Sequence, residues 1–187
     1  MVISGPSGSG KSTLIRQALA RSGPRVRLAV SATTRAPRDG ERDGIDYYFV
    51  SREQFQDAID VGDFLEWAEF AGNFYGTPRA ELGRPDHAGE CVLLEIEVQG
   101  ALQVRAKVPD ALLVWVDVPS FEALEARLRG RHTESEESVT RRLARARWEL
   151  SQAHQYHERV LNDDLEKAVQ DLVALLGKHG CGEVAGR

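Results

Sequence analysis

The chain has 187 residues, of which 42% are hydrophobic and 28% are charged, a balance typical of one folded domain and incompatible with disorder throughout. Its net charge of −5 disfavours a general nucleic-acid coat and a protein that binds anionic membranes. No apolar run approaches the ~18 residues of a membrane span, and the N-terminus does not resemble a signal peptide, so we expect a cytoplasmic protein. Cys91 and Cys181 are interpreted as reduced thiols, with a disulfide as the open alternative.

The first half of the chain alternates short strands and helices around a loop rich in Pro, Gly and charge. In chain order we expect a strand at 2–4, a helix at 14–19, a strand at 26–31, a loop at 34–46, a strand at 47–50, a helix at 51–62, and strands at 64–70 and 73–75. Ser51, followed three residues later by Gln54, predicts a capping box at the second helix start. Thr77 and Pro78 predict the start of a further helix, which Gly83-Arg84-Pro85 ends early.

The second half continues with longer apolar runs. We expect buried strands at 91–98 and 112–118, a helix at 121–128, a polar loop at 133–137, a long amphipathic helix at 139–153, a strand at 160–161 and a last helix at 165–176. This order predicts an α/β fold, a parallel sheet flanked by helices, interrupted between about 32 and 85 by a strand-rich insertion. Parallel sheets bind ligands beyond the carboxyl ends of their strands, here Ser4, Ser31, Glu97 and Val118.

The strongest motif follows the first strand. It matches G-x-x-x-x-G-K-[ST] at every fixed position, between an apolar strand and an amphipathic helix. Its glycines let backbone N–H groups converge on phosphate oxygens, and the helix N-terminus adds partial positive charge. Lys11 supplies a full charge for the β- and γ-phosphates, and the Ser12 hydroxyl is a ligand for Mg²⁺. We therefore expect ATP to bind at Gly5, Pro6, Ser7, Gly8, Ser9, Gly10, Lys11, Ser12 and Thr13.

A second phosphate-binding segment follows the strand that ends at Ser31. Arg35 and Arg38 lie three residues apart on this loop, and guanidinium groups donate two parallel bonds to phosphate oxygens. Tyr47 and Tyr75 offer hydroxyl donors nearby in the predicted insertion. The alternative from this segment alone is a solvated loop with surface ion pairs.

Two further segments are specific: Thr33-Thr34-Arg35-Ala36-Pro37-Arg38-Asp39-Gly40-Glu41 and the turn Gly72-Asn73-Phe74-Tyr75-Gly76. They are accompanied by Glu66-Trp67, Leu94–Gly100, Arg129-Gly130-Arg131 and Leu161-Asn162-Asp163-Asp164. With these segments, in order along residues 3–176, the chain resembles guanylate kinase. The resemblance implies a single domain with three parts: a core of residues 1–31, 86–126 and 157–187, a GMP-binding lobe of residues 32–85, and a lid of residues 127–156.

The resemblance also implies the role of individual residues. Ser31, Glu66, Thr77 and Glu97 are expected to face guanine. The monophosphate is expected to bind to Arg35, Arg38, Tyr47 and Tyr75, with Glu41 bracing the arginines or the ligand. Arg131 and Arg142 are expected to close from the lid onto the transferring phosphoryl group, and Arg127 and Asn162 to lie near the adenine of ATP. The catalytic side chains are then Lys11, Arg35, Arg131 and Arg142.

The chemistry of guanine agrees with these residue types. Guanine presents two N–H donors to a carboxylate such as Glu66, whereas adenine offers an unprotonated ring nitrogen at the same edge. A buried polar group left unpaired costs about 1–3 kcal/mol, which favours guanine. Glu95 and Glu97 depart from the family pattern, where at least one aspartate is expected, so whether Glu97 reaches guanine directly or through water stays open.

The resulting prediction is ATP + GMP ⇌ ADP + GDP, by in-line phosphoryl transfer with Mg²⁺. The predicted partners are ATP and GMP, with no nucleic acid and no membrane, and the chain is a monomer or a homodimer. Two alternatives remain: a non-enzymatic guanylate-kinase-like interaction module, and a P-loop kinase for another small phosphorylated acceptor. The intact Gly8, Gly10, Lys11 and Ser12 argue against the first, and Ser31 and Glu66 against the second.

Overall fold

The computed structural model describes residues 1–83, 90–130 and 136–181. Within these residues the helices are α1 (Lys11–Arg21), α2 (Arg52–Asp60), α3 (Val98–Lys107), α4 (Phe121–Arg129), α5 (Glu136–Ser151) and α6 (Leu165–Lys178), with short 3₁₀ turns η1 (Arg79–Glu81) and η3 (Ala153–Gln155). The strands are β1 (Val2–Ser4), β2 (Val26–Leu28), β3 (Ala32–Thr33), β4 (Tyr48–Phe49), β5 (Phe64–Phe70), β6 (Asn73–Pro78), β7 (Cys91–Glu95), β8 (Leu113–Asp117) and β9 (Glu158–Leu161).

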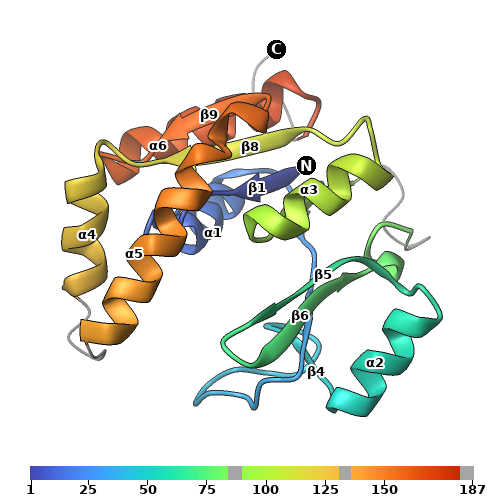
Figure 1. Ribbon diagram of the computed structural model, residues 1–187. Coiled ribbons are helices and arrows are strands. Elements are labelled where there is room, and N and C mark those ends of the chain that lie inside the picture. Colours follow the sequence, from blue (N-terminus) through green and yellow to red (C-terminus); the bar gives the residue numbers. More distant parts are fainter. Residues whose placement is uncertain (84–89, 131–135, 182–187) are drawn as a thin grey trace.

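The described residues form two separate sheets (Figure 1). The core sheet has the order β2-β7-β1-β8-β9, and all of its pairings are parallel. Its strands alternate between two apolar clusters, so that Leu113 and Trp115 of β8 face one side and Val114 and Val116 the other. Helices α1 and α6 cover the side of Val114 and Val116, and α3 covers the side of Leu113 and Trp115. The α/β class predicted from the sequence is confirmed.

The second sheet has the order β4-β3-β6-β5 and lies within the predicted insertion. Its strands pair antiparallel, except that β3 and β4 are parallel. Phe55 of α2 stacks on Phe64 and Phe74 and closes a small apolar cluster of its own. The predicted capping box of α2 is confirmed, because the Ser51 side chain accepts from the Gln54 backbone and Gln54 reciprocates.

Three expectations about local structure are wrong. The helix predicted at Thr77 is absent, because Thr77 and Pro78 pair with β5 and only the turn η1 follows. Cross-strand pairing here outweighs the preference of proline for a first helical turn. The strand predicted at 26–31 ends at Leu28, and the strand predicted at 91–98 ends at Glu95. The Gly83-Arg84-Pro85 break lies mostly outside the described residues.

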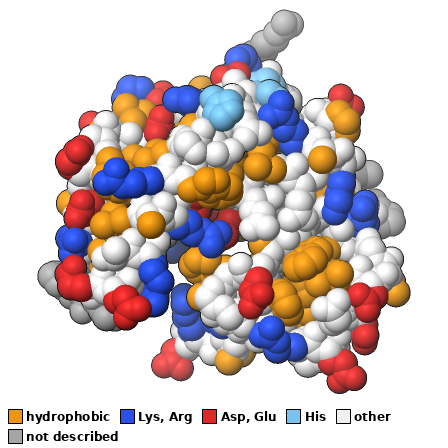
Figure 2. Space-filling view, viewed as in Figure 1, with side chains coloured by type: hydrophobic (Ala, Val, Ile, Leu, Met, Phe, Trp, Pro, Cys, Tyr) orange, Lys and Arg blue, Asp and Glu red, His pale blue; other side chains and the backbone are white. Residues whose placement is uncertain are grey.

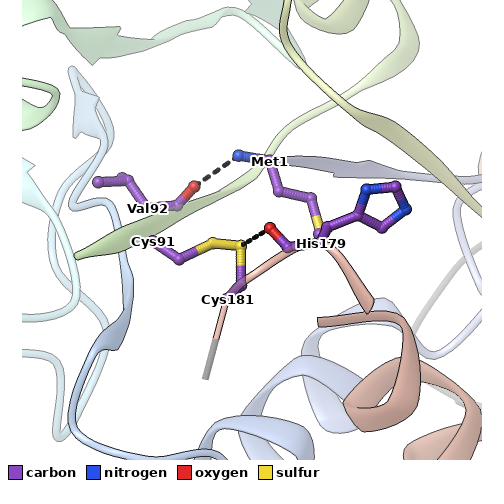
Figure 3. The surroundings of a disulfide bond; sticks show 5 residues. All are labelled: Met1, Cys91, Val92, His179 and Cys181. Atoms are coloured by element: carbon purple, nitrogen blue, oxygen red, sulfur yellow. Dashed lines mark hydrogen bonds between the residues drawn. A yellow bond between two sulfur atoms is a disulfide. The ribbon is translucent and has the colours of Figure 1, made fainter. Parts of the chain in front are cut away.

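The interpretation of the two cysteines as free thiols is also wrong. Cys91 at the start of β7 and Cys181 just beyond α6 form a disulfide, with Cα atoms 5.1 Å apart (Figure 3). The two cysteines are 90 positions apart in the sequence but close in space, because the end of α6 packs beside the first residues of β7. Among the described residues, no helix is long and apolar enough to cross a membrane.

Candidate active site

A cleft of about 380 Å³ lies between the carboxyl ends of the core strands and the second sheet. Figure 2 shows it as a hollow between the two sheets, with basic and acidic side chains at its mouth. The cleft brings together residues from distant segments that the sequence analysis selected. They are Lys11, Ser12, Ser31, Arg35, Arg38, Glu41, Tyr47, Glu66, Tyr75 and Glu97.

The phosphate loop runs from β1 into α1 with a backbone that requires glycine. Gly10 is the N-cap of α1 with φ of 83°, and an added Cβ would lie 2.6 Å from the Asn162 Nδ2 atom. Gly8 also has a positive φ, 93°, and faces Leu124 and Leu128 closely. Because both positions combine a left-handed backbone with close neighbours, the loop keeps the compact form in which backbone N–H groups bind phosphate.

Two side chains of this loop region point to phosphate chemistry. The Lys11 ammonium donates to the carbonyl oxygen of Gly5 at 2.7 Å, so it lies over the loop itself. The Ser12 hydroxyl donates to Glu95 Oε1 at 2.6 Å. Because the hydroxyl proton goes to Glu95, the Ser12 oxygen retains lone pairs for a cation.

Asn162 and Arg127 lie behind the phosphate loop. Asn162 is buried, and its Nδ2 donates to the Ser9 carbonyl at 2.6 Å. Arg127 Nη2 donates to the Asn162 carbonyl at 2.8 Å. In the structure these residues brace the loop, whereas their expected contact with adenine stays a prediction.

The predicted phosphate-binding arginines are held by one carboxylate. Arg35 donates through both terminal nitrogens to Glu41, at 3.0 and 2.9 Å, and the Arg38 backbone N–H donates to the same carboxylate at 2.7 Å. These hydrogen bonds lower the pKa of Glu41 and raise that of Arg35. The Arg35 guanidinium also lies 5.4 Å from the ring centre of Tyr47. Of the two roles expected for Glu41, bracing the arginines is the one this geometry provides.

The cleft is also lined by two carboxylates with raised pKa values, Glu66 and Glu97. Glu66 of β5 is 4% exposed and accepts a hydrogen bond from Thr77 Oγ1 at 2.6 Å. Burial raises the pKa of Glu66, partly offset by the hydrogen bonds from Thr77. Glu97, the N-cap of α3, also has a raised pKa because of burial, with Arg145 acting in the opposite direction. A buried carboxylate that lines a cleft suits a ligand edge with two N–H donors.

Helix α5 presents a row of side chains to the phosphate loop and to Glu97, and most of them are not among the predicted site residues. Arg142 Nη2 donates to Ser7 Oγ at 2.7 Å, which places this arginine beside the phosphate loop, whereas its action on the transferring phosphoryl group stays a prediction. Arg145 contacts Glu97 and Glu149, and Glu149, 3% exposed, accepts from the Ser7 N–H at 3.1 Å. The spacings of three and four residues from 142 to 149 are the sequence signal that could have found this face. Arg131, the other predicted lid arginine, lies outside the described residues.

Comparison with known proteins identifies the family. The family model described as guanylate kinase matches residues 1–179. The guanylate kinase of Parasynechococcus marenigrum is 53% identical over 176 residues, covering 94% of this chain and 96% of that protein. The guanylate kinase of Rubrobacter xylanophilus is 51% identical over 94% of this chain and 92% of its own length. A crystal structure of guanylate kinase from Anaplasma phagocytophilum superimposes with a TM-score of 0.76 and 32% identity, over 98% of this chain and 88% of that one. The chain belongs to the guanylate kinase family.

Proposed function

We propose that this chain transfers the γ-phosphoryl group of ATP to the phosphate of GMP, giving ADP and GDP. The observation that carries the proposal is the cleft that joins Lys11 and Ser12 to Arg35, Arg38 and the buried Glu66. Lys11 and Ser12 offer a triphosphate site, Arg35 and Arg38 offer guanidinium groups for a monophosphate, and Glu66 offers a carboxylate for a purine edge. Family membership supports the same reaction.

The reaction needs alignment and charge neutralisation more than covalent chemistry. An oxygen of the GMP phosphate attacks the γ-phosphorus in line with the leaving ADP oxygen, and that oxygen is already anionic near neutral pH. No separate base is therefore required. Arg35, oriented by Glu41, holds the acceptor phosphate, while Lys11 and Arg142 stabilise charge on the transferring group.

The residues around Ser12 fit a magnesium ion bound together with ATP. The Ser12 oxygen lies at the first turn of α1 with its proton donated to Glu95. Among the described residues, no group of three or more His, Cys, Asp or Glu side chains could hold a metal by itself. We infer that phosphate oxygens and water supply the remaining ligands, as is usual for Mg²⁺, and that the ion neutralises charge on the phosphates.

The choice of base follows from Glu66. An ionised carboxylate accepts from both guanine N–H groups, whereas the same edge of adenine carries a lone pair that the carboxylate repels. Glu97 and Ser31 line the same cleft and complete the expected base site.

We further propose that the enzyme acts in the cytoplasm, as a monomer or a homodimer, on free nucleotides and without a nucleic-acid or membrane partner. The net charge of −5 supports the last point. A reducing cytoplasm would keep the Cys91–Cys181 pair open, which this reaction tolerates because the pair lies at the start of β7 and the cleft at its end.

The test is product analysis. Purified protein is incubated with MgATP and GMP, and the nucleotides are separated by ion-exchange chromatography. Equal amounts of ADP and GDP support the proposal. GMP binding without GDP formation would instead favour the non-enzymatic interaction module. Turnover only with a different phosphorylated acceptor would favour a P-loop kinase for that acceptor. Lys11→Ala should abolish GDP formation without a large loss of thermal stability.

A further inference from the structure

Arg145 connects three parts of the molecule at the mouth of the cleft. Its Nη2 atom donates to Glu97 Oε2, and its Nε donates to Glu149 Oε1 at 3.1 Å. The guanidinium carbon also lies 4.8 Å from the ring centre of Phe70, at the end of β5. One side chain of α5 therefore contacts the N-cap of α3, its own helix and the second sheet.

A second carboxylate, Glu149, holds this guanidinium in place. Glu149 is buried, and its second oxygen accepts from the backbone N–H of Ser7 in the phosphate loop. Arg145 consequently lies between Glu149, which is bound to the phosphate loop, and Glu97, which lines the cleft. A bridging guanidinium with two such partners has little rotational freedom.

The carboxylates that line the cleft repel one another, and the positive charge of Arg145 can offset this repulsion. Glu95, Glu97 and Glu66 line the cleft together, while Glu149 lies just behind Arg145. The facing cations are Lys11 from α1 and Arg145 from α5, with Lys107 of α3 acting on Glu66. Glu97 is a long side chain with 37% exposure, so without a partner it would sample several rotamers and move away from the other carboxylates.

We propose that Arg145 is a positioning residue for base recognition, which holds Glu97 by Oε2 so that Oε1 faces the purine. Glu97 lines the cleft, so its second carboxylate oxygen is the atom that we assign to the ligand. The inference rests on the proposed function and adds a residue to which the family resemblance assigned no role. Arg145 acts through Glu97 and does not itself contact the reacting phosphates.

The test separates GMP affinity from turnover. Arg145→Met keeps an unbranched, flexible side chain and removes its charge, and we expect the KM for GMP to rise roughly 10- to 100-fold, since a hydrogen bond between charged groups is lost. The value of kcat and the KM for ATP should each change by less than about threefold. Arg145→Lys should recover part of the GMP affinity. Arg141→Met is the matched control, because Arg141 is exposed on the same helix and pairs with Glu137.

A double-mutant cycle identifies the route of the effect. In a Glu97→Gln background, Arg145→Met should raise the KM for GMP by less than about twofold, because the group that Arg145 positions is already altered. An undiminished effect in that background overturns the proposal. So does a lower KM for GMP in Arg145→Met, which would mean that Arg145 competes with guanine for Glu97, or a loss confined to kcat. Thermal unfolding of each variant excludes a folding defect, and failure of the parent enzyme to form GDP would refute the proposed function rather than this inference.

Discussion

Thr77 Oγ1 donates a 2.6 Å hydrogen bond to Glu66 Oε1, and both side chains are buried. The single hydroxyl proton of Thr77 is thereby committed to the carboxylate. In this arrangement Thr77 orients Glu66 and can only accept a hydrogen bond from a ligand. Thr77 is expected to face guanine, and this geometry lets it act on guanine in part by orienting Glu66.

This pair predicts a pH dependence. Burial raises the pKa of Glu66 above its usual range, and guanine recognition needs the ionised form. As the pH falls through this raised pKa, kcat/KM for GMP should fall. Thr77→Val removes a hydrogen bond that lowers the pKa, so the acid limb should move to higher pH. The phosphate of GMP also titrates, near pH 6, so the limb due to Glu66 is measured as the difference between the parent and Glu66→Gln, in which it should be absent.

Gly100 of α3 provides a steric test of the same carboxylate. A Cβ added at Gly100 would lie 2.2 Å from Glu66 Oε2, so Gly100→Ala must displace Glu66. We expect at least a tenfold rise in the KM for GMP with the fold retained. Gly177→Ala is the matched control in α6, where the new Cβ meets nothing within 4 Å. That variant should keep its activity and gain up to about 1 kcal/mol in unfolding free energy. Equal KM values for the two variants would contradict the position of Glu66.

The lid arginines are expected to act on the transferring phosphoryl group. Arg142→Ala should lower kcat on the order of 100-fold and change the KM for GMP much less, because its charge counts most in the transition state. Arg141→Ala on the same helix should be close to the parent. Steady-state kinetics with varied GMP would reassign Arg142 to acceptor binding if the KM rises while kcat is unchanged. The same expectation holds for Arg131, which lies outside the described residues.

The disulfide is expected to stabilise the fold and to leave catalysis unchanged. Breaking it by reduction or by Cys181→Ser should lower the unfolding free energy by about 2–4 kcal/mol, as for other disulfides that close long loops. Denaturant titrations with and without reductant measure this difference, and Cys181→Ser should no longer respond to reductant. Loss of kcat on reduction would show that the bridge is coupled to the cleft.

Much of the fold follows from local patterns in the sequence. The apolar run from Leu112 to Val118 predicts a strand buried on both faces, and Ser51 with Gln54 predicts the start of α2. No amphipathic pattern in the sequence indicates helix α3, because this helix has contacts on several sides. Val98 and Ala101 pack on the core sheet, while Gln103 bonds Trp67 of β5. The end of β6 was missed because strand pairing is a long-range effect.

The site was predictable where a motif encodes it. The phosphate loop and the segment from Ser31 to Glu41 carry their chemistry in consecutive residues, and the cleft contains most of them. Arg145, Glu149 and Gly100 were not selected, because their importance arises from packing between segments far apart in the chain. The interpretation of Cys91 and Cys181 as reduced thiols is wrong for the same reason.

The most direct test of the account is base selectivity. ADP release is measured with MgATP and each of GMP, AMP, CMP and UMP, for the parent and for Glu66→Gln, with Glu69→Gln as an exposed control on the same strand. The account predicts turnover with GMP and almost none with the others, and a kcat/KM for GMP that falls about 10- to 150-fold in Glu66→Gln but stays near the parent value in Glu69→Gln. Comparable turnover of AMP and GMP by the parent, or undiminished preference for GMP in Glu66→Gln, would contradict it.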